Sequence, residues 1–298
     1  MAPVSTSSLS VVTVAQIGVE KGASEFLDMI QVGAPAQAIT LTQKGLRYYV
    51  HGEVLEDRDF QTLQNNNWFN DKVINAFLKK IMEDENRKSM EHVFVIPSYL
   101  AVLWENDQYG TWMYKKVKLS LYKWIFMPVN VNRNHWVLLV ADVYKRTVSI
   151  LDSLPTPGSS TLIEKWKKYM KLRASVAGEL PDWEEGDLVS SKQCDGSSCG
   201  PFVLMNALAI VNNIPIQELN TDMATYMRQY VSSSLLQAAK QPPSQRSTCD
   251  MLGCCRPTSE KCWICCDVCG RWMHFSCINI NQSPEGDYVC PICIAQYE

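Results

Sequence analysis

Cys199 is the first residue of this sequence whose setting suggests chemistry. It lies near the end of the small-residue stretch QCDGSSCG, residues 193–200, directly before the apolar run PFVLMNALAIV. A helix that begins here would lower the pKa of the Cys199 thiol and favour the thiolate. Gly196 and Gly200 let the backbone approach a substrate, and Pro201 suits the first helical turn. The stretch predicts a nucleophilic cysteine; the alternative is a small packing residue.

Three other residues complete a hydrolytic set. A cysteine nucleophile needs a base, a group that orients the base, and donors for the oxyanion. His135 opens the strand-like run HWVLLVADV, and Asp152 ends TVSILDS. Gln193 carries an amide that suits an oxyanion. An antiparallel pair turning near Lys145 returns Asp152 toward His135, but counting leaves them a few residues out of register. We expect a bulge or a strong twist to close that gap. Each residue alone has a structural reading, so the prediction depends on the combination.

A second constellation is the cysteine-rich segment, residues 249–298. Ten of the twelve cysteines fall between Cys249 and Cys293. In an intracellular chain such a cluster favours metal over disulfides. Seven cysteines and one histidine suffice for two tetrahedral zinc sites, and metal would supply most of the folding free energy of so short a segment. Cys262 and Cys265 are interpreted as non-ligating. The candidate ligands are Cys249, Cys254 or Cys255, Cys266, Cys269, His274, Cys277, Cys290 and Cys293.

Composition limits the remaining possibilities. The chain has 298 residues, of which 46% are hydrophobic and 20% charged, with a net charge of −3. It can bury a substantial core, and its charge favours neither nucleic acid nor an anionic membrane as partner. No apolar run approaches the length of a membrane span. The N-terminus is a poor secretory signal, so we expect a protein of the nucleus or cytoplasm that is not secreted.

The elements that would position these residues mix helices and strands without regular alternation, which predicts an α+β fold. Residues 1 to about 22 are interpreted as a mobile tail. Apolar residues at helical spacing between 73 and 81 predict a helix capped by Asn70 or Asp71. The predicted domains are a poorly defined N-terminal tail (1–40), a protease domain (41–237), a polar linker (238–248) and a separate zinc-binding module (249–298).

The larger domain resembles the ubiquitin-like-protein-specific proteases, also called sentrin- or SUMO-specific proteases. The similarity rests on NHWVLLV, on LDS seventeen residues after the histidine, on QCDGSSCG, and on LEDRDFQTLQNNNWFNDKVINAF. The resemblance implies a papain-like α+β fold. It also implies that Cys199 is the nucleophile and His135 its base. Asp152 would then orient the base and Gln193 would serve the oxyanion hole.

The same resemblance implies a substrate site. Trp68 and Trp136 would cover a narrow tunnel through which only a Gly-Gly tail passes, because glycine has no side chain. Asp71 matches a position that helps to grip the ubiquitin-like partner. The sequence departs from the family at Ser198, where an Asp usually precedes the nucleophile, and at Leu151, where an aromatic residue often precedes the catalytic Asp. Both departures concern which modifier is preferred rather than the chemistry.

The cysteine-rich segment resembles a plant homeodomain (PHD) finger through WICCDVCGRWMHFSC. That family interleaves its ligand pairs, so that pairs one and three hold one zinc and pairs two and four the other. A RING finger is the rival, which the single histidine in fifth place disfavours. Trp263 and Trp272 match walls of a methyl-lysine cage, and Asp267 could pair with an arginine of a histone tail. The alternative is that Trp272 mainly packs between the zinc sites and that Trp263 is an ordinary strand residue.

These observations predict a cysteine protease or isopeptidase that cleaves after Gly-Gly of a SUMO-like modifier. It would carry a reader with two structural zinc ions and need no cofactor for catalysis. One alternative is a histone-tail binding protein with an inactive protease domain, which the complete His–Asp–Gln–Cys set disfavours. Another is an acyltransferase built on the same residues, which the tunnel tryptophans disfavour.

Overall fold

The structure is a computed structural model that describes residues 12–32, 47–88, 92–111, 113–114, 117–154, 156–158, 161–239, 249, 254, 262–266, 271–290 and 294, with the backbone alone at 12–21 and 47. Within these residues, no helix is long and apolar enough to cross a membrane. The centre of the fold is a five-stranded mixed sheet. In spatial order its strands are β3 (Val93–Val95), β4 (Trp124–Val131), β5 (His135–Asp142), β6 (Thr147–Leu151) and β7 (Glu184–Glu185).

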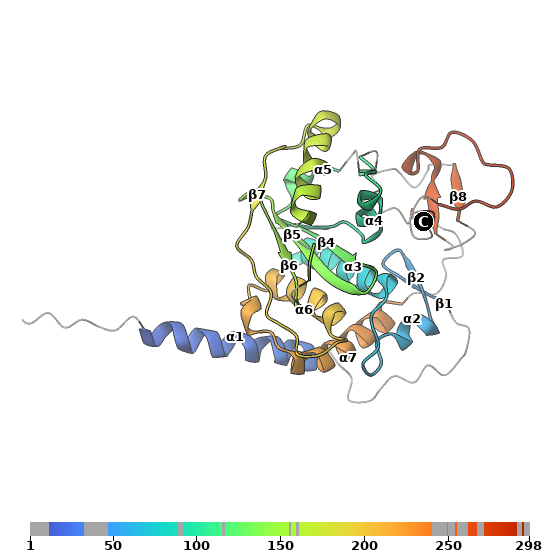
Figure 1. The fold of residues 1–298 in the computed structure, drawn as a ribbon. Helices are drawn as coiled ribbons and strands as arrows, with labels where there is room; N and C mark the ends of the chain where they lie inside the picture. Colours follow the sequence, from blue (N-terminus) through green and yellow to red (C-terminus); the bar gives the residue numbers. More distant parts are fainter. Residues whose placement is uncertain are drawn as a thin grey trace, which may run out of the picture.

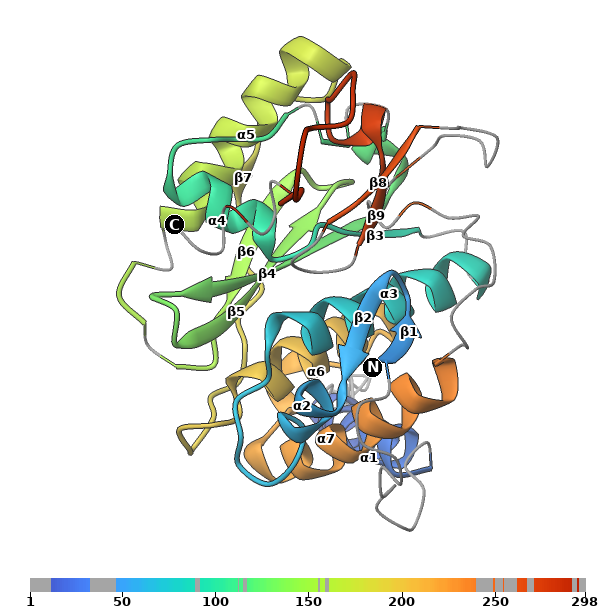
Figure 2. The same ribbon diagram turned by 90° about the vertical axis from the view of Figure 1, so that its right-hand side faces the viewer.

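Helices cover both faces of the sheet (Figures 1 and 2), which confirms the predicted α+β class. Helices α3 and α6 lie on one face, and α4 and α5 on the other. Helix α6 is apolar on every side, and most of its residues are buried, because it lies between the sheet and two other helices. The helix bounds are α2 (Asp57–Gln61), α3 (Asp71–Lys88), α4 (Tyr99–Glu105), α5 (Thr161–Ala177), α6 (Cys199–Val211) and α7 (Thr221–Ala238). Short 3₁₀ helices span η1 (Leu119–Leu121), η2 (Ile216–Glu218) and η3 (Phe275–Cys277).

Local sequence signals explain where the elements that carry the site begin. The side chain of Asn70 accepts a hydrogen bond from the Val73 amide at 3.1 Å, so Asn70 caps α3 as one of the two predicted candidates. Strand β3 leads directly into α4, as the run HVFVIPSYLAVLWEN predicts. The turn between β5 and β6 falls at residues 143–146, where a hairpin turn was expected.

The N-terminal segment differs from the prediction. Residues Val12–Val32 form helix α1, which lies beside α7 and η2 (Figure 1), so the expected mobile tail, residues 1 to about 22, is wrong from residue 12 onward. Phe26 and Ile30 lie one helical turn apart and are fully buried. The sequence interpretation weighed the Ser, Val and Ala content of the first residues and missed this i, i+4 apolar pair.

The cysteine-rich segment also differs from the prediction, because it docks on the protease domain instead of standing apart (Figures 1 and 2). Its strands β8 (Trp263–Cys265) and β9 (Trp272–His274) lie near the hairpin of β1 (Arg47–Val50) and β2 (Glu53–Glu56). Arg271 forms a buried ion pair with Glu53, and its guanidinium lies 6.0 Å from the ring centroid of Tyr99 on α4. Buried residues of the segment, among them Ile264 and Met273, belong to the same hydrophobic core as the protease domain. Most of the predicted linker falls outside the described residues.

Candidate active site

The predicted base and its predicted orienting group meet at one end of the β5–β6 hairpin. His135 Nε2 and Asp152 Oδ1 are 2.7 Å apart, and both side chains are buried. The strands pair without a bulge from Asp142–Thr147 to Leu138–Leu151. Continuing this register by one residue places Asp152 opposite Val137, so His135 is its diagonal neighbour on the same face. The expected bulge is therefore absent, and a diagonal contact closes the two-residue offset.

The nucleophile candidate stands at the start of a long buried helix. Cys199 is the first residue of α6 and is 3% exposed. Burial alone would lower the pKa of His135, but hydrogen bonds to Asp152 and Cys199 outweigh it and raise that pKa to about 9. Burial would raise the pKa of Asp152, yet the contacts with His135 and the Leu154 amide lower it. The site therefore favours an imidazolium between a carboxylate and the Cys199 sulfur, which is the charge state that activates a thiol.

The loop before Cys199 is fixed by two side chains that the sequence analysis overlooked. The Asp195 carboxylate accepts hydrogen bonds from the amides of Ser197 and Ser198 and from the Ser198 hydroxyl. The Ser153 hydroxyl donates to Gln193 Oε1 at 2.6 Å. That contact makes Nε2 of Gln193 the donating end of the amide. One Nε2 hydrogen goes to the Asp195 carbonyl at 2.7 Å. These are the contacts of an Asx turn, so Asp followed by Gly-Ser-Ser is the local signal that could have revealed the role of Asp195.

The two predicted tunnel residues are both tied to the site. Trp68 is 54% exposed, and its indole donates to the carbonyl of Gly196 at 2.9 Å. Gly196 lies in the loop of residues 193–198 that precedes Cys199, called the nucleophile loop below. Trp136 is buried, and its indole donates to the carbonyl of Phe69 at 2.9 Å. Asp71, at the start of α3, shares with Trp136 a groove of about 280 Å³. The groove is lined by Phe69, Asn70, Asp71, Ser98, Ala101, Val102, Glu105, Val129, Asn130, Arg133 and Trp136.

Comparison with known proteins fits this geometry. Residues 67–241, more than half of the chain, match the model of the Ulp1 protease family, C-terminal catalytic domain. The chain belongs to the Ulp1 protease family. Residues 67–241 therefore form a cysteine-protease domain of the Ulp1 type. The match ends before the cysteine-rich segment.

Individual relatives of this Ulp1-family chain agree. It is 31% identical over 187 residues to ubiquitin-like-specific protease 1 of Saccharomyces cerevisiae, covering 60% of this chain and 29% of that protein. It is 26% identical over 182 residues to sentrin-specific protease 2 of Homo sapiens, covering 58% of this chain and 31% of that protein. The chain thus spans about a third of the length of these curated relatives. A solved structure of the SUMO protease Ulp1, with its catalytic cysteine oxidised to a sulfinic acid, superposes with a TM-score of 0.55. It is 25% identical, and the match covers 73% of this chain and 94% of that one.

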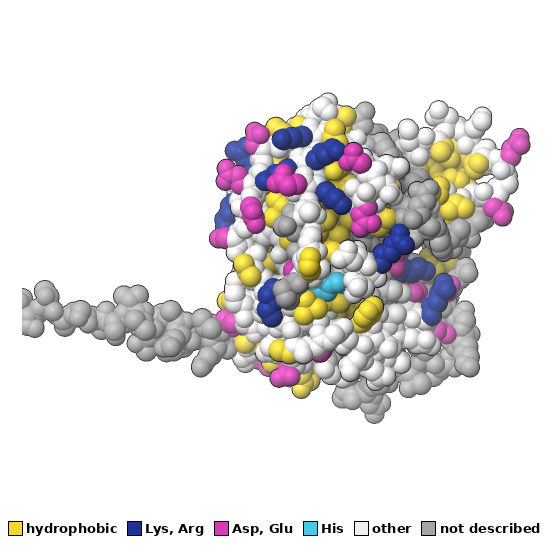
Figure 3. Space-filling model, in the orientation of Figure 1, with side chains coloured by type: hydrophobic (Ala, Val, Ile, Leu, Met, Phe, Trp, Pro, Cys, Tyr) yellow, Lys and Arg dark blue, Asp and Glu magenta, His cyan; other side chains and the backbone are white. Residues whose placement is uncertain are grey.

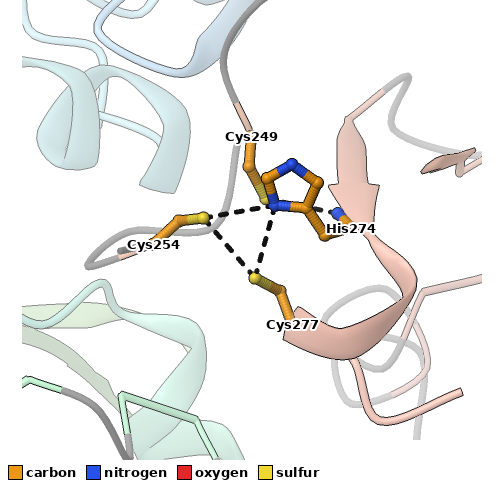
Figure 4. Close-up of side chains that lie close together, drawn as sticks. All are labelled: Cys249, Cys254, His274 and Cys277. Atoms are coloured by element: carbon orange, nitrogen blue, oxygen red, sulfur yellow. Dashed lines mark hydrogen bonds between the residues drawn. The ribbon is translucent and has the colours of Figure 1, made fainter. Parts of the chain in front are cut away.

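Outside the Ulp1-family domain, four predicted zinc ligands converge (Figure 4). Ligand atoms of Cys249, Cys254, His274 and Cys277 all lie within 4.8 Å of one another. Cys254 Sγ lies 3.6 Å from Cys277 Sγ and 3.3 Å from His274 Nδ1. A tetrahedral zinc ion with Zn–S bonds of about 2.3 Å places neighbouring sulfurs about 3.8 Å apart. This donor set therefore fits zinc, and it joins the predicted first and third ligand pairs.

The second predicted zinc site is only partly described. Cys266 and Cys290 are fully buried, and the Cys290 amide donates to Cys266 Sγ at 3.2 Å, which brings pairs two and four together. Cys255, Asp267, Cys269 and Cys293 lie outside the described residues. Cys262 is exposed and stands outside the four-residue cluster, as does Cys265.

The predicted cage tryptophans share one face of the β8–β9 ribbon. Trp263 pairs with His274 and Cys265 with Trp272, so the two tryptophans are diagonal neighbours. The ring centroids of Trp263 and His274 are 3.9 Å apart. Trp263 therefore packs on a candidate zinc ligand.

Proposed function

We propose that this chain is a cysteine protease or isopeptidase that cleaves after the Gly-Gly end of a SUMO-like modifier. The observation that carries the proposal is the series of hydrogen bonds from Asp152 to His135 and from His135 to Cys199, the first residue of α6. The names of the relatives, ubiquitin-like-specific and sentrin-specific proteases, support the substrate class. One structural relative, of 24% identity and TM-score 0.52, was solved in complex with Smt3, the yeast ortholog of SUMO.

The proposed reaction has two half-reactions, acylation of Cys199 and hydrolysis of the resulting thioester. The Cys199 thiolate attacks the carbonyl carbon of the terminal glycine, and the carbonyl oxygen becomes an oxyanion. The Gln193 amide and the N-terminus of α6 stabilise that charge. The His135 imidazolium gives its proton to the leaving amine as the C–N bond breaks, and a thioester remains. Neutral His135 then takes a proton from water, which attacks the thioester and releases the modifier and Cys199.

The tail and the body of the modifier would bind at different places. Trp68 and Trp136 would enclose the Gly-Gly tail near Cys199, where side chains would collide with the indoles. The groove beside Asp71 would take the folded body of the modifier. Its carboxylates, Asp71 and Glu105, suit a partner that presents basic side chains there.

A probe panel tests this proposal. Full-length SUMO, ubiquitin and other ubiquitin-like proteins, each ending in a C-terminal electrophile, are incubated with the full chain, and covalent adducts are resolved by mass. We expect the SUMO probe to react fastest and a Gly-Ala version of it to be rejected. Reaction with no ubiquitin-like probe would favour the inactive histone-tail binder, and acyl transfer to an added amine without hydrolysis would favour the acyltransferase.

For the cysteine-rich segment we propose a PHD-type finger with two zinc ions that are structural and take no part in catalysis. Cys249, Cys254, His274 and Cys277 would hold one ion. Cys266, Cys269, Cys290 and Cys293 would hold the other, and the buried pair of Cys266 and Cys290 supports this. Zinc would replace the core that so short a segment cannot build.

Histone-tail reading by this finger stays a prediction. Titration of trimethylated against unmodified lysine peptides, with Trp263→Ala as the comparison, tests the cage. Action in the nucleus also stays a prediction. Figure 3 shows Lys and Arg mixed with Asp and Glu over α5 and β7, which gives nucleic acid no single-sign surface on this face.

A further inference from the structure

Arg228 is a buried cation that the reaction above does not use. It lies on α7, it is 6% exposed, and no carboxylate forms an ion pair with it among the described contacts. Its neighbours on the same helical face, Ala224 and Val231, are buried and apolar. A guanidinium in such a place costs desolvation energy unless its hydrogen bonds compensate. The contacts that it makes are therefore informative.

The guanidinium joins the loop of Trp68 to the loop of Cys199. Nη1 donates to the carbonyl of Asn67 at 2.8 Å, and Nη2 donates to the carbonyl of Ser197 at 2.9 Å. The guanidinium carbon also lies 4.9 Å from the ring centroid of Phe69. Asn67 and Phe69 flank Trp68, and Ser197 follows Gly196.

The same two loops are joined a second time at the surface. There the Trp68 indole donates to Gly196, but Trp68 is 54% exposed, so water competes for that hydrogen bond. The Arg228 bridge is buried and charge-assisted, which makes it the stronger of the two. Only a planar fork can reach both carbonyls at once, so lysine cannot replace it.

We propose that Arg228 is a positioning residue of this active site: it fastens the Trp68 loop to the nucleophile loop and places a fixed positive charge behind Cys199. The inference depends on the proposed function in one respect: the assay of kcat and KM needs a SUMO precursor that the protein cleaves. Burial lowers the pKa of Arg228, and the charges of Asp195 and Cys199 oppose that effect. The carbonyl that Nη2 binds belongs to Ser197, two residues before Cys199, and His135 contacts Cys199 from β5.

Two variants separate the two effects. Arg228→Lys keeps the charge and loses the fork, and Arg228→Met loses both while it keeps an unbranched stem of similar length. The controls are Arg58→Lys and Arg58→Met, since Arg58 is exposed on α2 and its one ion pair among the described residues is with Glu56. Each full-length protein is assayed for kcat and KM on a SUMO precursor. The rate of iodoacetamide alkylation at Cys199 is measured against pH by peptide mass spectrometry.

We expect Arg228→Lys to lose about 10- to 100-fold in kcat with KM changed by less than about threefold, because misplacement of the tail affects the reacting geometry. Its alkylation profile should match the wild type. In Arg228→Met the midpoint of alkylation should rise by about one pH unit. A kcat for Arg228→Lys equal to that of the Arg58 controls would overturn the positioning role. An unchanged alkylation midpoint in a folded Arg228→Met protein would overturn the electrostatic role.

The experiment still decides the proposal if Arg228→Met does not fold or if the wild type cleaves no modifier. If Arg228→Met does not fold, the kcat of Arg228→Lys decides alone, since a normal value would leave Arg228 with a merely structural role. If the wild type cleaves no modifier, the proposed function fails, but the alkylation midpoint still reports on Cys199. A shift would then support the electrostatic contact, and no shift would overturn it.

Discussion

Replacing Arg271 with alanine is expected to lower the stability of the whole chain, because Arg271 makes a buried ion pair between the cysteine-rich segment and the protease domain. Glu53, its partner, is 7% exposed. Removing one partner of a buried ion pair costs about 3–5 kcal/mol, since the other charge stays buried. In a domain of this size that loss lowers the melting temperature by roughly 6–20 °C.

The pH dependence of this loss follows from Glu53. Burial raises the pKa of Glu53, and Arg271 opposes that rise. Without Arg271 the folded protein holds the Glu53 proton to higher pH than the unfolded chain does. The pKa of Glu53 is raised in the wild type as well, because burial outweighs the effect of Arg271, so the stability of the variant should fall further below that of the wild type once pH rises past this raised wild-type pKa.

The assay is thermal unfolding of the full chain at pH 5 and pH 8, with zinc content measured alongside. Arg58→Ala is the matched control, because its pair with Glu56 is largely exposed and worth less than about 1 kcal/mol. The double variant Glu53→Gln/Arg271→Met should recover part of the loss, since it leaves no buried charge. A melting temperature within about 2 °C of wild type for Arg271→Ala, with zinc retained, would refute the docked arrangement.

Three other predictions concern the catalytic pair, the oxyanion amide and the metal. The stabilisation by protonated His135 is complete below about pH 6.5 and is lost as pH rises through about 9, so the free energy of unfolding of the wild type should approach that of Asp152→Asn over this range in urea titrations; a pH-independent difference would argue against the ion pair. Ser153→Ala should lower kcat by about 10-fold with little change in KM, because it frees the Gln193 amide to turn; an unchanged kcat would show that Gln193 needs no anchor. His274→Ala should lose one of two zinc ions in native mass spectrometry and destabilise the cysteine-rich segment; a wild-type count of one or none would contradict the PHD assignment.

The sequence predicted the parts of this protein whose signals are local. Cys199 begins a helix, and Asn70 caps another, because each depends on a few neighbouring residues. The hairpin that carries His135 and Asp152 was predicted, but its diagonal contact was not. Counting opposite partners ignores that side chains two residues apart share a face of the sheet.

The missed features join segments far apart in the chain. Arg228 contacts carbonyls 161 and 31 residues away, and Arg271 contacts Glu53 across 218 residues. Two of the missed features left a signal in the sequence: Arg228 is a lone charge on an apolar helical face, and Phe26 and Ile30 lie one turn apart in α1. Such a signal predicts that a residue is buried, but the residues that it packs against are found only from the fold.

The most direct test of the proposed chemistry maps the residue that a modifier captures. The full chain is treated with a SUMO probe that carries an electrophile in place of the bond after Gly-Gly, digested, and sequenced by mass spectrometry. We predict a single adduct on Cys199, unchanged in Cys194→Ser and absent in Cys199→Ser. An adduct on Cys194, or labelling that survives in Cys199→Ser, would contradict the assignment of the nucleophile and the mechanism built on it.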